Sequence, residues 1–160
     1  MPHFEELGKY KYNILLKFIE NENLIKALIN DSEDFLNQSL PDDFDNTKLI
    51  YNYIFPYQKN FDSITEKKNF ITISLGNYDY INNEFKSGRV YIYIFVHNTM
   101  LRTSYECLRF EYIQNQIDIM LNKKYGIGAF NLELVTGGEF ILPNSEYYGA
   151  NLVYKFTDFQ

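Results

Sequence analysis

The 160-residue sequence has no tryptophan, one cysteine and two histidines. The single Cys107 excludes an internal disulfide, and two histidines are too few for a histidine-rich metal site. No apolar stretch approaches the roughly 18 to 20 residues that a membrane-spanning helix needs. The N-terminal MPHFEELGKYKY lacks the charged and apolar regions of a secretory signal peptide. We therefore expect no signal peptide, no membrane span and folding in a reducing cytoplasm.

Basic residues are also in short supply. Lys and Arg number 15 against 21 Asp and Glu, which gives a net charge of −6 at pH 7. Binding of nucleic acid by bulk electrostatics needs clustered basic residues, so the composition disfavours it. Hydrophobic content of 46% with 22% charged residues is typical of a folded protein. We expect a single domain over residues 1–160, mainly helical over 1–56, with the sheet and the main helix over 69–159.

Aromatic residues, by contrast, are abundant, with 15 Tyr and 14 Phe. Abundant Asn, Ile and Lys accompany them, as AT-rich codons produce, so their positions matter more than their number. The run Arg89–His97 alternates like a strand, whose side chains point to opposite faces with period two. Its two faces are an aliphatic one with Val90, Ile92, Ile94 and Val96, and an aromatic one with Tyr91, Tyr93, Phe95 and His97.

The aromatic face of this strand is unusual, because a half-solvated strand carries polar residues on its second face. We therefore expect Tyr91, Tyr93 and Phe95 to be covered, either by a loop of this chain or by a neighbouring subunit. Of the two, we favour the neighbour.

Helical periodicity predicts a helix from about Glu5 to Glu20 and further helical turns over Leu24–Ile29. Thr47–Phe55 is compatible with a short helix or an extended run. Gly76–Ser87, as the tip of a hairpin, and Thr136–Gly149 are predicted to be long loops. The later elements are strands Phe70–Leu75 and Arg89–His97, a helix from a Thr103–Glu106 capping box to about Lys124, and strands Phe130–Leu134 and Leu152–Phe156.

This order of elements predicts an α+β fold. N-terminal helices precede a β-β-α-β-β arrangement, so the helices should pack on one face of an antiparallel or mixed sheet.

Recognisable catalytic motifs are missing. The sequence has no Walker-type glycine–lysine motif and no Gly-x-Ser-x-Gly elbow. His97 is compatible with a base or a ligand, but a strand-end histidine without an obvious partner is more often structural. Asp42, Asp43 and Asp45 resemble half a calcium loop, without its glycine and distal glutamate. We therefore predict no enzymatic activity, no cofactor and no metal site.

Candidate interface residues are easier to name. Tyr91, Tyr93 and Phe95 are large, rigid side chains of the type enriched in protein interfaces. Arg102 and Arg109 flank the start of the predicted main helix and are candidates for pairing with acidic residues across an interface. The alternative for both arginines is ordinary surface charge.

The chain resembles the tail-terminator, tail-completion and head–tail connector (neck) proteins of tailed bacteriophages over roughly Leu7–Phe159. The resemblance is in the order of the segments ILLKFIENENLIKALIN, IFPY, FITISL, RVYIYIFVH, LRTSYECLRFEYIQNQIDIMLN, GIGAFNLELV and YYGANLVYKFTDF. It implies a non-catalytic virion protein of the neck or tail, present in the host cytoplasm during assembly.

The same resemblance implies the partners. Copies of the chain would form a ring, and the resemblance implies a hexamer or a dodecamer. A heterologous interface that closes makes such a ring. Tail-tube or connector and portal proteins would bind the ring, DNA would only pass through its lumen, and no membrane would be involved. From the residues alone, a small-molecule-binding or enzymatic α+β domain and an interaction module from a mobile element stay open as alternatives.

Overall fold

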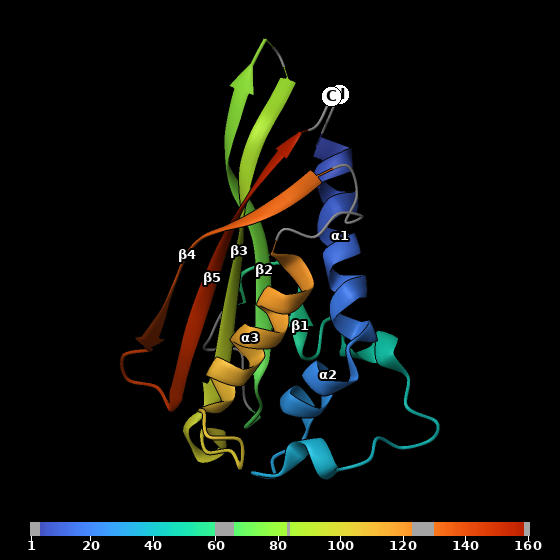
Figure 1. Cartoon of the computed structure of the whole chain (residues 1–160), viewed down its shortest axis with the longest axis vertical. Coiled ribbons are helices and arrows are strands. Elements are labelled where there is room, and N and C mark those ends of the chain that lie inside the picture. The colour runs from blue at the N-terminus through green and yellow to red at the C-terminus, as the bar shows by residue number, and fades with distance from the viewer. Residues whose placement is uncertain (1–3, 60–65, 83, 123–129, 159–160) are drawn as a thin grey trace.

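The computed structural model describes residues 4–59, 66–82, 84–122 and 130–158 (Figure 1). Its helical elements are α1 (Phe4–Glu20), α2 (Glu22–Ile29), the 3-10 turns η1 (Phe35–Asn37), η2 (Asn46–Leu49) and η4 (Asn98–Met100), and α3 (Arg109–Leu121). Its strands are β1 (Ile54–Phe55), β2 (Phe70–Ile81), β3 (Glu84–His97), β4 (Phe130–Ile141) and β5 (Tyr147–Asp158).

The strands form one mixed sheet in the order β1-β2-β3-β5-β4. β1 pairs in parallel with β2, and the β2–β3, β3–β5 and β5–β4 pairs are antiparallel. Helices α1, α2 and α3 lie together on one face of this sheet (Figure 1). The predicted α+β architecture, with N-terminal helices and one helical layer, is therefore confirmed.

The core lies between the helical layer and the aliphatic face of β3. Val90, Ile92, Ile94 and Val96 are all fully buried, as their alternation predicts. They join one cluster with Phe18 of α1 and Ile113 and Ile117 of α3, among others. Each such side chain stabilises the fold by about 1.5–3 kcal/mol on burial, so β3 anchors the sheet to the helices.

The two predicted long loops are wrong, because both segments are mostly strand. β2 and β3 continue to a tight turn at Asn82, and β4 and β5 continue to a turn at residues 142–146. Register shifts occur in β2 between Gly76 and Tyr80 and in β4 between Leu134 and Thr136. A bulge inserts one extra residue, so side chains beyond it switch to the opposite face. The period-two alternation that predicts a strand is therefore interrupted in both segments.

The predicted start of the main helix is also wrong. Thr103 lies in a loop, where its hydroxyl donates to the Cys107 carbonyl oxygen at 2.5 Å. α3 begins at Arg109, and the Glu111 carboxylate accepts from the Leu108 amide at 3.1 Å. The helix ends at Leu121, and its predicted continuation to Lys124 falls outside the described residues. The ambiguous Thr47–Phe55 segment contains both states, with η2 followed by β1.

Gly149 provides a stability test of the sheet. A Cβ at Gly149 would lie 2.1 Å from the Ile94 carbonyl oxygen and 2.6 Å from the Phe140 ring, closer than atoms can approach. We expect Gly149→Ala to lower the free energy of unfolding by about 1–3 kcal/mol through this overpacking. The matched control is Gly138→Ala, whose nearest contact would be the Asn151 side chain at 3.5 Å. Urea denaturation compares the two, and equal midpoints would contradict the prediction.

Candidate interaction surface

Tyr91, Tyr93 and Phe95 lie on the sheet face away from the helices, and each is half-buried. Rings from β2 and from β4, which lies beyond β5, pack against Tyr93 and Phe95. Phe70 of β2 stacks on Phe95 with ring centroids 4.6 Å apart, and Phe140 of β4 lies edge-on to Phe95 at 5.5 Å and to Tyr93 at 6.1 Å. These five residues, Phe70, Tyr91, Tyr93, Phe95 and Phe140, are called the aromatic face below.

One end of the aromatic face is covered by the chain itself. Phe55 of β1, Phe70 and Tyr147 form a second, smaller buried cluster, against which Phe95 packs. The Tyr147 hydroxyl donates to the Glu66 carbonyl oxygen at 3.1 Å, which ties this cluster to the residues just before β2. Part of the expected cover is therefore intramolecular, while Tyr91 and Tyr93 stay partly open to solvent.

A small pocket opens beside the aromatic face. It has a volume of about 180 Å³ and is lined by Gln58, Lys59, Thr72, Tyr93 and Phe95. The Lys59 ammonium lies 5.0 Å from the centre of the Phe55 ring, a cation–π contact that holds this lysine beside the pocket.

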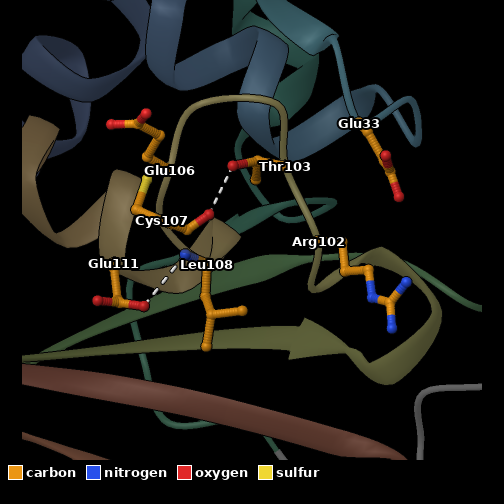
Figure 2. Close-up of a pocket in the computed structure, with 7 residues that line it drawn as sticks. All are labelled: Glu33, Arg102, Thr103, Glu106, Cys107, Leu108 and Glu111. Atoms are coloured by element: carbon orange, nitrogen blue, oxygen red, sulfur yellow. Dashed lines mark hydrogen bonds between the residues drawn. The ribbon is translucent and has the colours of Figure 1, made fainter.

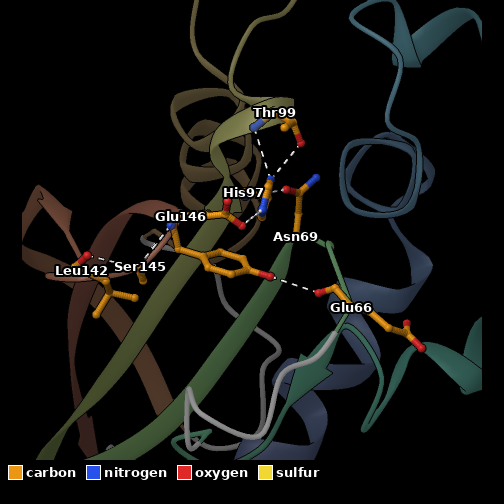
Figure 3. Close-up of polar contacts among 8 residues, drawn as sticks. Glu66, Asn69, His97, Thr99, Leu142, Ser145 and Glu146 are labelled. Carbon is orange, nitrogen blue, oxygen red and sulfur yellow. Dashed lines mark hydrogen bonds and ion pairs between the residues drawn. The ribbon is translucent and has the colours of Figure 1, made fainter.

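His97 has partners that its place at a strand end does not reveal (Figure 3). Its buried ring places Nε2 2.9 Å from the Glu146 carboxylate, while Nδ1 accepts from the Thr99 amide at 3.3 Å and lies 2.8 Å from the Thr99 hydroxyl. The Asn69 side-chain oxygen accepts from the His97 amide at 3.2 Å. Both ring nitrogens are thus engaged, and the ring joins the β4–β5 turn to the end of β3. This arrangement agrees with a structural role for His97, the more common role of a histidine at a strand end.

The contact between His97 and Glu146 predicts a pH dependence. The hydrogen bond that the Glu146 carboxylate accepts from His97 lowers the pKa of this carboxyl below its ordinary 4.5. The folded protein therefore binds this proton more weakly than the unfolded chain does, so the stabilisation is complete above pH 4.5 and is lost as the pH falls through the lower, folded-state pKa.

We expect Glu146→Gln to flatten this acid-side loss. The measurement is the urea midpoint of wild type and variant from neutral pH down to about pH 3. Glu139→Gln, at an exposed glutamate of β4, is the control and should follow wild type. Parallel curves for wild type and Glu146→Gln would contradict the role of this carboxylate.

Arg109 is not an interface residue, and that prediction is wrong. Its side chain is fully buried at the start of α3. Nε donates to the Met100 carbonyl oxygen at 2.7 Å, and the two terminal nitrogens donate to main-chain oxygens of Ala27, Asn30 and Ser32 at 2.7–2.9 Å. The guanidinium also lies 4.6 Å from the centre of the Phe35 ring. Arg109 therefore joins α2 to α3 inside the protein.

Arg102, in contrast, is exposed. It lines an open groove of about 470 Å³ together with Glu33, Thr103, Glu106, Cys107, Leu108 and Glu111 (Figure 2). Within the described ranges, no three His, Cys, Asp or Glu side chains are grouped so that they could hold a metal ion. Because Glu33, Glu106 and Glu111 line it, the groove is an acidic, open surface. Arg102 stays a candidate interface residue.

The two arginines form a matched pair for mutation. Arg109→Met removes four hydrogen bonds to main-chain oxygens, two of them buried and two part-buried, so we expect a loss of about 3–5 kcal/mol in the free energy of unfolding. Arg102→Met removes an exposed side chain and should change it by less than about 0.5 kcal/mol. Chemical denaturation measures both, and a similar effect of the two variants would contradict the structural role of Arg109.

The fold and this surface define a small α+β protein with one helical layer and a partly open, aromatic sheet face. Residues 21–156 match the family model YomW, which is most of the chain, so the protein belongs to the YomW family. This family derives from a phage region of Bacillus, which indicates a phage-associated protein. A search of curated proteins gave no match. Among the helices that the structure describes, none is long and apolar enough to cross a membrane.

Proposed function

We propose that this protein is a structural assembly protein of a phage neck or tail. Copies form a ring that terminates the tail tube or joins it to the head connector, first in the host cytoplasm and then in the virion. The phage-associated family supports the setting. The observation on which the role rests is the partly open aromatic face, on the side of the sheet that no described helix covers.

The edges of the sheet add to this support. β4 is an edge strand, and Leu134, Val135 and Ile141 along it are exposed apolar side chains. On the edge of β2 that faces away from β3, β1 pairs only with Ile71 and Thr72. The rest of that edge has no partner strand in the described sheet. Unpaired edges with apolar side chains are sites where another strand adds, and charge, proline or a bulge such as the one at Val135 limits such addition.

The arrangement of these surfaces favours a ring over a symmetric dimer. The aromatic face, the β4 edge and the β2 edge are different surfaces of one chain. A contact between two different surfaces is heterologous, and repeating it generates a closed ring when the rotation allows. The ring, its partners and the absence of catalysis are parts of this proposal.

An edge variant tests assembly. Val135 in β4 is 45% exposed, and a lysine there opposes strand addition. We expect Val135→Lys to reduce oligomer formation in light scattering over a range of concentrations, alone and with a tail-tube or connector protein, without changing the melting temperature. Ile119→Lys is the control, because Ile119 is similarly exposed (57%) but lies on α3. A wild-type protein that is a strict monomer and binds no virion component would refute the proposed function.

A further inference from the structure

The far end of the β2–β3 hairpin projects beyond the rest of the sheet (Figure 1). β5 pairs with β3 only from Ser87 onward, so β2 and β3 pair with each other alone between Asp79 and Ser87. Tyr80 lies in this projecting part and is 59% exposed. A hairpin arm with an exposed aromatic ring is suited to reach a surface outside its own chain.

The pocket beside the aromatic face has the size of one aromatic ring. Its volume of about 180 Å³ lies below the roughly 300–1,000 Å³ of sites for drug-sized ligands. An apolar cavity of about 150 Å³ is known to hold benzene. Tyr93 and Phe95 supply aromatic walls, and Gln58 and Lys59 supply polar groups within reach of a phenol hydroxyl.

Tyr80 cannot enter the pocket of its own chain. Thr72, which lines the pocket, and Tyr80 lie in the same strand, eight residues apart. At about 3.4 Å per residue, the strand separates them by roughly 27 Å. A ring from the arm can therefore reach this pocket only in another copy.

We propose that Tyr80 of one copy inserts into the pocket formed by Gln58, Lys59, Thr72, Tyr93 and Phe95 of the next copy. This inference rests on the proposed ring and names one of its contacts. Charge supports the pairing of these two regions. The exposed Asp79 adjoins Tyr80, while Lys59 lines the pocket. The contact is heterologous, as a ring requires.

The first test removes the ring from the arm. Tyr80→Ala should raise the concentration at which oligomers form by about thirtyfold, the loss typical of an interfacial hot spot. Tyr12→Ala is the matched control, because Tyr12 is a tyrosine of similar exposure (52%) on α1. Light scattering over a concentration series measures both variants, and their melting temperatures should equal that of wild type. Oligomers of Tyr80→Ala that form at the wild-type concentration would overturn the inference.

The second test fills the pocket and then combines the variants. Gln58 is exposed at the pocket, so Gln58→Trp should block it without disturbing the core, and should impair assembly as Tyr80→Ala does. A mixture of the two variants retains one intact arm and one intact pocket. It should therefore form one-to-one pairs and no larger species. A mixture that stays monomeric, or that forms full-size oligomers, would overturn the inference.

The outcomes separate this inference from the proposed function. Wild-type oligomers that need neither Tyr80 nor an open pocket would leave the ring intact and refute this contact. Loss of assembly with Gln58→Trp but not with Tyr80→Ala would assign the pocket to another part of the neighbouring copy and refute Tyr80 as its occupant. A monomer that binds a tail-tube protein would refute this contact and leave the virion role standing.

Discussion

The structure depends on a positive charge that is sealed inside it. Burial lowers the pKa of Arg109 to about 10, which still leaves the guanidinium charged at neutral pH. Two of its acceptors, the carbonyl oxygens of Ala27 and Asn30, belong to the end of α2. The last carbonyls of a helix lack intrahelical donors and form the negative end of its dipole. One side chain thus satisfies acceptors that α2 leaves unpaired and fixes α2 against α3.

Because α1, α2 and α3 all lie on one face of the sheet, the opposite face needs another source of stabilisation. With no second helical layer in the described chain, the far face is stabilised by rings packed across strands. Phe70, Phe95 and Phe140 come from three different strands and contact one another in sequence across the sheet. Phe70 and Phe95 are directly paired on adjacent strands, and an aromatic cross-strand pair of this kind contributes roughly 0.2–1 kcal/mol. The aromatic residues therefore stabilise the monomer as well as offering a surface to a partner.

Local pattern explains which features could be predicted from the sequence. The two faces of β3 were predictable because alternation is a property of neighbouring residues, and the helix order gave the α+β class. The role of Arg109 could not be predicted, because its acceptors are main-chain oxygens, which any residue type supplies. For three of the four hydrogen bonds, the acceptor lies 77–82 residues away in the sequence. Similarly, His97 and Glu146 are 49 residues apart and meet only through the register of β3 and β5.

The short β1 has a consequence for any strand that adds to this side of the sheet. β1 occupies the edge of β2 at Ile71 and Thr72 and nowhere else. An added strand would meet β1 end-on and could not slide past it. Strands that are polar or rich in glycine specify their pairing register weakly, and β2 has that character around Gly76 and Asn77. The two residues of β1 would thereby limit the register in which another strand could pair along β2.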